Sequence, residues 1–173
     1  MKDANNRKSG FTLLELLIVI GIIAVLSVTL ILVLNPAETM KKARDTQRMS
    51  DLATLKTALG LYLTGTSTPY LGGNMADTSC GSLKSSSTTP DMPVDSTGWI
   101  PVNFSTLRGG SPISNLPLDP TNSGDYAYWY KCNSSDKTFE VSTVLESSEY
   151  LDKMTTDGGN ETGRYEIGSK LSL

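Results

Sequence analysis

The chain has 173 residues, a formal net charge of −3 and no histidine. This length allows one modest globular domain together with an apolar anchor. The absence of histidine removes the commonest general base and transition-metal ligand, and no glycine-rich phosphate loop, Gly-x-Ser-x-Gly or Cys-x-x-Cys motif occurs. The sequence therefore offers no candidate catalytic site. A membrane-tethered enzyme that uses its carboxylates stays an alternative.

The N-terminal part of the chain predicts a membrane helix. Residues 11–34 contain one charged residue, Glu15. As a helix they extend roughly 36 Å at about 1.5 Å per residue, enough to cross a hydrocarbon core of about 30 Å. Three basic residues and one acid precede the span, so the positive-inside bias holds residues 1–10 in the cytoplasm. No Ala-x-Ala cleavage site or lipobox cysteine follows, and we expect the span to stay attached.

The sequence Gly-Phe-Thr-Leu-Leu-Glu, from Gly10 to Glu15, resembles the processing motif of bacterial type IV prepilins and type II secretion pseudopilins. The motif combines a short charged leader, a small residue, an aromatic residue and one acid at a fixed place in an apolar helix. The resemblance implies that a prepilin peptidase removes the leader, residues 1–10, by cutting after Gly10. The same enzyme would then methylate the new N-terminus at Phe11.

Glu15 is the one acid of the apolar span. In the resembling families, the acid at this place pairs with the cationic N-terminus of a neighbouring subunit as filaments assemble, and the resemblance gives Glu15 that role. A carboxylate within a membrane span costs a few kcal/mol, so such residues usually have a partner. In the alternative, Glu15 lies close enough to the interface to reach water without one.

Asn35-Pro36 follows the apolar span. A proline inside a helix removes one hydrogen bond and clashes with the preceding turn, which predicts a kink of one long helix at Pro36. Pilins resemble this chain in having a proline in the corresponding region. The alternative is that Pro36 begins a separate helix in its first turn, with Asn35 as the cap.

Residues 35–63 predict an amphipathic helix. Apolar residues recur at steps of three and four from Met49 to Leu63, and we expect the sheet of a globular head to cover them. The charged residues are predicted to form a solvated face: Lys41, Lys42, Arg44, Asp45, Arg48 and Asp51. Intersubunit pairing or binding of anionic lipid by these residues is the alternative.

Residues 64–173 are predicted to form an exported globular head. Seven basic and thirteen acidic residues follow Leu63, so we expect the isolated head to bind no nucleic acid. Residues 64–98 are rich in Ser, Thr, Gly and Pro and predict a long surface loop. In pilins the corresponding region is variable and often carries contacts that distinguish filaments. An inert loop is the alternative.

The two cysteines, Cys80 and Cys132, both fall in the predicted head. Oxidising conditions outside the cytoplasm favour a disulfide between them. By the chain-entropy model, a closed loop of about 50 residues stabilises the fold by up to roughly 4 kcal/mol. Two unrelated buried thiols are the alternative.

Residues 99–104 predict a first strand or an edge segment, and three further segments of the head predict strands: residues 126–132, 138–145 and 164–168. Pro101 argues for an edge position of residues 99–104. The order of a Pro-x-Asp-Pro motif, an aromatic strand, a turn and a further strand is similar to the heads of pseudopilins and short pilins. We expect the tyrosines of residues 126–132 to pack in the core and across strands, rather than to stack on nucleic-acid bases.

Asp157, Asn160 and Glu161 lie close together in the sequence with two glycines between them. Their oxygens suit Ca²⁺, a hard cation that accepts six to eight oxygen ligands. Major pseudopilins are similar in carrying calcium in a C-terminal loop. The alternative is a plain polar turn without a metal.

These observations predict an α+β fold, in which a long bent N-terminal helix carries a small antiparallel sheet on its C-terminal half. The resemblance implies a structural, non-enzymatic subunit of a type IV pilus or pseudopilus. It would wait in the inner membrane as a single-pass precursor, until an assembly platform and ATPase draw it into a homo-oligomeric filament, extracellular or periplasmic. The alternative is a membrane-anchored minor pilin or binding domain that recognises a ligand through residues 64–98. The sequence does not distinguish a major pilin from a pseudopilin.

Overall fold

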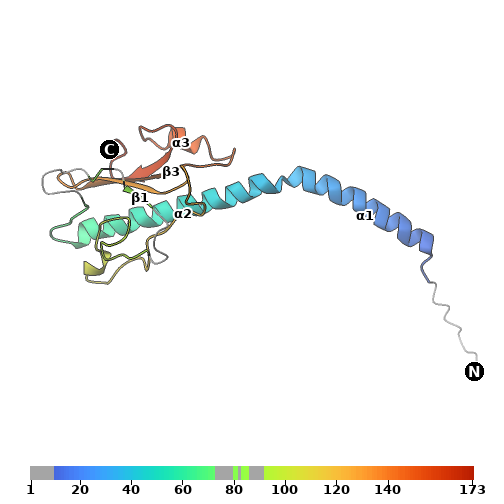
Figure 1. The fold of residues 1–173 in the computed structure, drawn as a ribbon, viewed down its shortest axis with the longest axis horizontal. Coiled ribbons are helices and arrows are strands. Elements are labelled where there is room, and N and C mark those ends of the chain that lie inside the picture. The colour runs from blue at the N-terminus through green and yellow to red at the C-terminus, as the bar shows by residue number, and fades with distance from the viewer. Residues whose placement is uncertain (1–9, 73–79, 82, 86–91) are drawn as a thin grey trace, which may run out of the picture. The chain divides into compact units, whose positions relative to one another are not determined.

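The computed structural model describes residues 10–72, 80, 81, 83–85 and 92–173. It contains two long helices, one short helix and a small antiparallel sheet, so the predicted α+β class is confirmed (Figure 1). The described residues divide into two compact units, one up to Thr39 and one from Met40. The second unit contains the sheet and most of the second long helix.

The two long helices are α1 (Leu13–Leu34) and α2 (Pro36–Gly65), and Asn35 separates them. Asn35 has a left-handed backbone, with φ 37° and ψ 77°, which ends α1. Its side-chain Oδ1 also accepts a hydrogen bond of 3.4 Å from the backbone N–H of Glu38. Pro36 is therefore the first residue of α2, a position where the missing N–H costs nothing. At this junction the chain follows the alternative prediction, in which Asn35 caps a separate helix that begins at Pro36.

The sheet has four antiparallel strands in the order β1 (Leu83–Lys84), β2 (Trp129–Asn133), β3 (Thr138–Thr143) and β4 (Tyr165–Gly168). In its central register Tyr130 pairs with Val141, and Val141 pairs with Ile167. The three predicted strands after residue 125 are therefore present, with shorter bounds. The two-residue β1 was not predicted.

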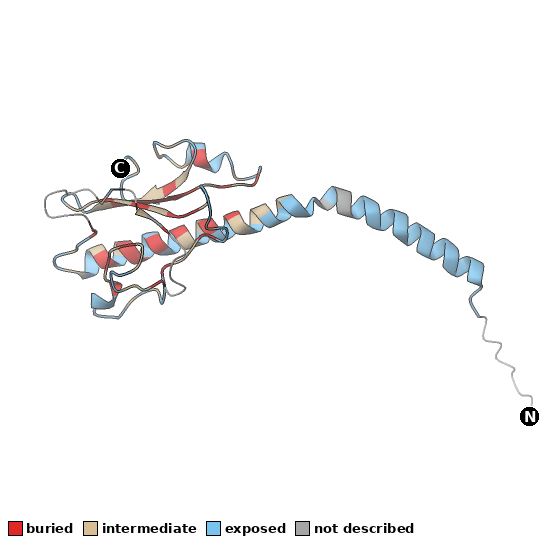
Figure 2. Ribbon diagram, in the orientation of Figure 1, coloured by how far each residue is buried: buried red, intermediate tan, exposed pale blue. Residues whose placement is uncertain are grey.

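The core of the head lies between α2 and one face of the sheet. Leu52, Leu55 and Leu59 of α2 are fully buried, as the apolar periodicity predicted. Tyr128 and Tyr130 are fully buried on the opposite side of this core, which confirms their packing role. Figure 2 shows the buried positions of α2 along the part of the helix beside the sheet.

Residues 99–104 do not form a first strand, one of the two predicted alternatives for this segment. Ile100, Val102 and Phe104 are fully buried, but the segment forms an isolated bridge between Asp95 and Asn103 and then a 3₁₀ helix, Phe104–Thr106. The Oδ1 atom of Asn103 accepts a hydrogen bond of 3.0 Å from the backbone N–H of Ser105 and begins this turn. An asparagine cap thus ends the extended segment before it pairs along a ladder.

The prediction that residues 64–98 form a surface loop is also wrong in part. Leu71, Ser85 and Met92 are buried, and β1 belongs to this segment. The hydroxyl of Tyr130 donates a 2.8 Å hydrogen bond to the carbonyl oxygen of Leu71, which ties the segment to β2. Residues 73–79, 82 and 86–91 of the segment lie outside the described part.

The other face of the sheet is covered as well. The short helix α3 (Lys153–Thr156) and the turn that follows it lie on this side, away from α2 (Figure 1). Glu140, Ser142 and Glu166 consequently have at most 2% of their surface exposed. The sequence analysis made no prediction for this face of the sheet, and the polar layer was missed.

Candidate processing and assembly site

The predicted cleavage junction lies just before the first helix. Gly10 and Phe11 are outside any helix or strand, and α1 begins at Leu13. The Phe11 side chain is 83% exposed. An exposed, non-helical segment is the kind of backbone that a peptidase can bind. The predicted leader before Gly10 lies outside the described residues.

Glu15 forms a capping box with Thr12 at the start of α1. The Glu15 Oε2 atom accepts hydrogen bonds from the Thr12 backbone N–H at 2.9 Å and from the Thr12 hydroxyl at 2.8 Å. In return, the Thr12 Oγ1 atom accepts a 3.2 Å hydrogen bond from the backbone N–H of Glu15. The Thr-x-x-Glu spacing is a known sequence signal for this motif, and the sequence analysis missed it. Glu15 therefore has a partner within its own chain.

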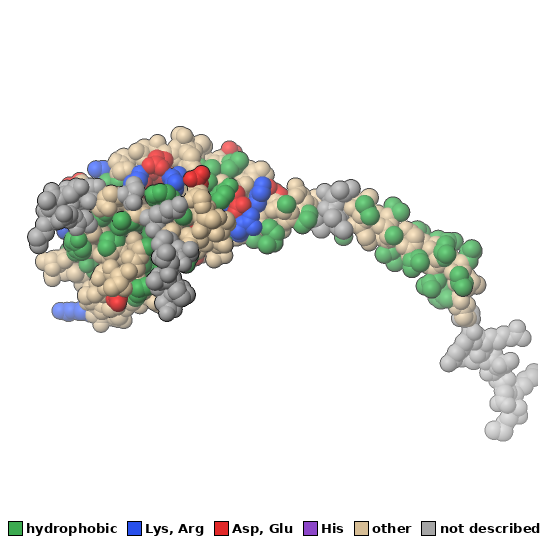
Figure 3. Space-filling model, viewed as in Figure 1, with side chains coloured by type: hydrophobic (Ala, Val, Ile, Leu, Met, Phe, Trp, Pro, Cys, Tyr) green, Lys and Arg blue, Asp and Glu red, His purple; other side chains and the backbone are tan. Residues whose placement is uncertain are grey.

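The surface of α1 is apolar and uncovered. Leu13–Leu30 is long and apolar enough to cross a membrane by length and composition, and none of it is buried (Figures 2 and 3). The hydroxyl of Ser27 donates to the carbonyl oxygen of Ile23 at 2.7 Å, and Thr29 donates to that of Leu26 at 2.8 Å. The polar groups of this stretch are thus satisfied within the helix, as a lipid environment requires.

Arg48 and Asp45 of α2 are fully buried, so the prediction that they lie on a solvated face is wrong. Their positions continue the apolar stripe through Leu52 at steps of three and four. The Arg48 guanidinium donates to both carboxylate oxygens of Asp119, at 2.7 and 3.0 Å, and to Asp45 at 2.8 Å. A charge can occupy this face because it is paired and hydrogen-bonded.

Glu146, which follows β3, completes this group. Its Oε1 atom accepts from Arg48 at 2.7 Å, and Arg44 donates to both of its carboxylate oxygens, at 2.6 and 2.7 Å. Asp45 accepts the backbone N–H of Glu146 at 3.1 Å. We call the five residues that share these bonds the ionic cluster: Arg44, Asp45, Arg48, Asp119 and Glu146. It joins α2 to the segments before β2 and after β3.

The ionic cluster lowers the pKa values of Glu146 and Asp119. The hydrogen bonds from Arg44, followed by those from Arg48, lower the pKa of Glu146 to about 2. Burial acts to raise the pKa of Asp119, but the Arg48 guanidinium and two backbone N–H groups outweigh it and lower that pKa. Both carboxyl groups are therefore ionised in the folded protein near neutral pH.

The other charged residues of the predicted solvated face are partly buried. Asp51 accepts a 2.7 Å hydrogen bond from the hydroxyl of Tyr128. Lys42 forms an ion pair with Glu149, near the start of α3. These contacts are made within the head and give no support to lipid binding by this part of α2.

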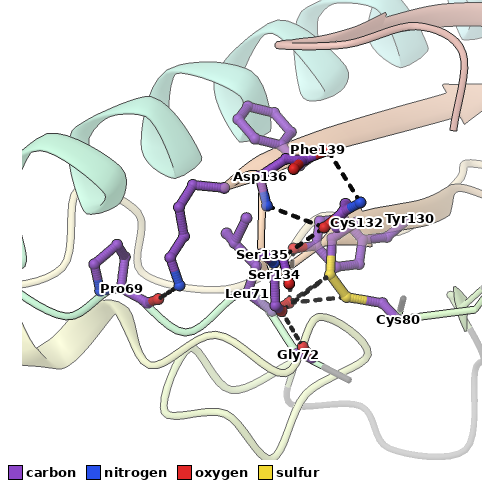
Figure 4. Close-up of a disulfide and its surroundings, with 12 residues drawn as sticks. Pro69, Leu71, Gly72, Cys80, Tyr130, Cys132, Ser134, Ser135, Asp136 and Phe139 are labelled. Carbon is purple, nitrogen blue, oxygen red and sulfur yellow. Dashed lines mark hydrogen bonds between the residues drawn. A yellow bond between two sulfur atoms is a disulfide. The ribbon is translucent and has the colours of Figure 1, made fainter. Parts of the chain in front are cut away.

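Cys80 and Cys132 form a disulfide, so the alternative of two unrelated thiols is wrong. Their Cα atoms are 5.1 Å apart, and the bond spans 52 residues of sequence. The backbone N–H of Cys80 also donates to the carbonyl oxygen of Cys132 at 3.1 Å. Both sulfur atoms lie 3.4 Å from the carbonyl oxygen of Leu71. Figure 4 shows this arrangement. The disulfide thus fastens the segment before β1 to β2.

The candidate calcium ligand Asp157 is hydrogen-bonded to the backbone of its own turn and of β4. The two carboxylate oxygens of Asp157 accept the backbone N–H groups of Gly159 and Glu166, at 2.8 and 2.7 Å. Asn160 is exposed. Among the described residues, no group of three or more His, Cys, Asp or Glu side chains is placed to hold a metal ion. Calcium binding stays a prediction that these contacts do not favour.

Glu161, the third candidate ligand, pairs with two basic side chains. Its Oε1 atom lies 2.5 Å from the Nζ atom of Lys131, and its Oε2 atom lies 3.3 Å from the Nε atom of Arg164. Burial opposes the charge of Lys131, but the bond to Glu161 and the charge of Glu140 outweigh it and raise the pKa of Lys131. Burial, together with the charge of Glu140, raises the pKa of Glu166 to about 7.

Residues 5–31 match the family model of the prokaryotic N-terminal methylation motif. The match covers the predicted cleavage junction, the capping box and most of α1. Comparisons with curated proteins and with solved structures found no match. The chain therefore carries the N-terminal methylation motif that is the signature of the type IV pilins and pseudopilins.

Proposed function

We propose that this protein is a structural subunit of a type IV pilus or pseudopilus. A prepilin peptidase cuts after Gly10 and methylates Phe11, and α1 holds the precursor in the inner membrane as a single span. An assembly platform and its ATPase then draw the subunit into a homo-oligomeric filament outside that membrane. The proposed role is structural rather than enzymatic.

The observation that carries this proposal is the uncovered apolar surface of α1, most of which lies within the methylation motif. Side chains all around the helix are exposed, including Leu14 at 68%, Val25 at 66% and Leu30 at 60%. Apolar surface costs about 25 cal/mol per Å² in water, so this helix requires lipid or other apolar helices. A bilayer surrounds this apolar surface before assembly, and a bundle of equivalent helices buries it in a filament.

The capping box suggests how Glu15 takes part in assembly. In the single chain its carboxylate is satisfied by Thr12, so the precursor carries no unpartnered acid at this place. Cleavage after Gly10 creates a cationic amine at Phe11, one residue before Thr12. When helices bundle, the amine of a neighbouring subunit offers Glu15 a charged partner in a medium without water, where such a pair is stronger than in water.

The test is the recovery of this polypeptide in filaments sheared from cells that have an active prepilin peptidase and assembly system. We expect the wild-type chain in the sheared fraction, and Glu15→Gln retained in the membrane fraction. Glu38→Gln, at the start of α2, is the matched control and should assemble as the wild type does. A wild-type chain that is processed and stable, yet absent from every sheared filament, would contradict the proposal.

A further inference from the structure

Lys131 lies at the centre of a group of oxygen atoms on the outer face of the sheet. Its Nζ atom is 2.5 Å from Oε1 of Glu161, 3.1 Å from the main-chain oxygen of Leu173 and 3.6 Å from Oε1 of Glu140. These oxygens come from the turn after α3, from the end of the chain described here and from β3. The Lys131 side chain is only 19% exposed.

This arrangement has the form of a cation site, with an ammonium group in place of a metal ion. The lysine projects from β2. Glu140 is its register partner on the neighbouring strand β3, whereas Glu161 and Leu173 come from segments that do not pair with β2. A calcium ion needs six to eight oxygen ligands at about 2.3–2.6 Å. The carboxylate of Asp157 is committed to two backbone N–H groups, and that of Glu161 to Lys131 and Arg164.

The local charges also oppose a divalent ion. A metal ion bound to Glu161 would lie next to two cationic side chains, Lys131 and Arg164. Like charges at such short range repel strongly when they are partly removed from water. Arg164 is itself held in place, with its guanidinium 4.8 Å from the ring centre of Trp129. The Glu161 carboxylate of the turn is therefore already paired with two positive charges, those of Lys131 and Arg164.

We propose that the Lys131 ammonium is the resident cation of the turn after α3, in the place for which the sequence predicted calcium. It holds Glu161 of the turn and Glu140 of β3 against β2. The turn then closes over the buried carboxylates of the sheet without a metal ion. This role concerns the head alone and does not depend on filament assembly.

The first test needs no variant. The full-length protein, purified in detergent, is unfolded by heat in excess Ca²⁺, in excess Mg²⁺ and in a chelator. Because Lys131 supplies the charge, we expect the same Tm in all three solutions. A Tm that rises in Ca²⁺ but not in Mg²⁺ would overturn the proposal, because the wild-type turn would then hold calcium.

Variants separate the charge of Lys131 from the space that it fills. Lys131→Met keeps most of the stem but removes the ammonium, and we expect its Tm to fall by about 3 °C or more in every solution. Lys131→Ala removes the ammonium and most of the stem, so its Tm should fall at least as far as that of Lys131→Met, by the same amount in Ca²⁺ as in the chelator. Lys131→Arg keeps the charge and should stay close to the wild type in all three solutions.

Lys170→Met is the matched control, because Lys170 is an exposed lysine whose Nζ atom lies 3.9 Å from Asp136. Its Tm should stay close to that of the wild type. Hydrogen exchange of residues 157–164 gives a local readout, and protection should be lost in Lys131→Met and kept in Lys170→Met. Equal protection in both variants would also overturn the proposal.

Discussion

Arg48 and Asp119 are 71 residues apart in the sequence and are joined by two hydrogen bonds, of 2.7 and 3.0 Å, in the interior of the head. Arg48 is fully buried and Asp119 is 4% exposed. Asp119 belongs to the Pro-x-Asp-Pro motif before β2, and it also accepts the backbone N–H of Thr121 at 2.8 Å. One guanidinium thus fixes the motif against α2.

Removing Arg48 should destabilise the head strongly. Arg48→Met leaves the carboxylates of Asp45 and Asp119 buried without their cation, which typically costs about 3–5 kcal/mol in the free energy of unfolding. Denaturant unfolding of the full-length protein in detergent measures this loss. Lys56→Met, at an exposed position of α2, should change stability by less than about 0.5 kcal/mol. Equal effects of the two substitutions would contradict the assigned role of Arg48.

The ionic cluster should make the head sensitive to acid. The pKa of Glu146 is lowered from 4.5 to about 2 in the folded protein, chiefly by its hydrogen bonds to Arg44. Because the folded-state pKa lies below the unfolded one, Glu146 contributes its full stability above pH 4.5 and loses it as the pH falls towards 2. Glu146→Gln should therefore show a shallower fall in unfolding free energy over this range.

Glu149→Gln is the control for this pH profile, because Glu149 is a more exposed acid in an ion pair with Lys42. It should keep the slope of the wild type. Some slope should also persist in Glu146→Gln, since the pKa of Asp119 is lowered as well. A profile of Glu146→Gln that runs parallel to the wild type would rule out this assignment.

The disulfide should contribute substantially to the stability of the head. For a bond that spans 52 residues, the chain-entropy model gives a contribution of about 4 kcal/mol. We expect the double variant Cys80→Ser, Cys132→Ser to lose an amount of this order in denaturant unfolding. Reduction of the wild-type protein should produce a similar loss and leave the double variant unaffected. A wild-type protein as stable after reduction as before would contradict this prediction.

The capping box should stabilise the first turn of α1. Thr12→Ala removes the side-chain bonds to Glu15, and losing such a cap costs typically about 1 kcal/mol. Hydrogen exchange in detergent micelles should show faster exchange at residues 13–16 in Thr12→Ala. Thr12→Ser retains the hydroxyl and should exchange as the wild type does. Identical exchange in Thr12→Ala and Thr12→Ser would show that the box does not form in solution.

Features that depend on local periodicity were predictable. The step of three and four residues identified Leu52, Leu55 and Leu59 as core positions, and alternation located Tyr130 in a strand. The same periodicity reaches Arg48, but a charged residue in such a stripe is buried only if distant partners neutralise it. Those partners, Asp119 and Glu146, are set by tertiary packing and are not visible in a local pattern.

Other features were likewise predictable only where their signal is local in the sequence. The capping box was fully encoded in four consecutive residues from Thr12 to Glu15 and was available from the sequence. The two-residue strand β1 is too short for any alternation to identify. The sequence analysis assigned no role to Lys131. Its place among Glu140 and Glu161 depends on how the turn after α3 folds over the sheet.

The most direct test of the central claim is the intact mass and N-terminal sequence of the protein isolated from membranes of cells with an active prepilin peptidase. The account predicts a chain that begins at Phe11 and carries a methyl group on its α-amine. Such a chain establishes the processing on which filament assembly depends. A chain that keeps the leader and begins at Met1 under these conditions contradicts the account.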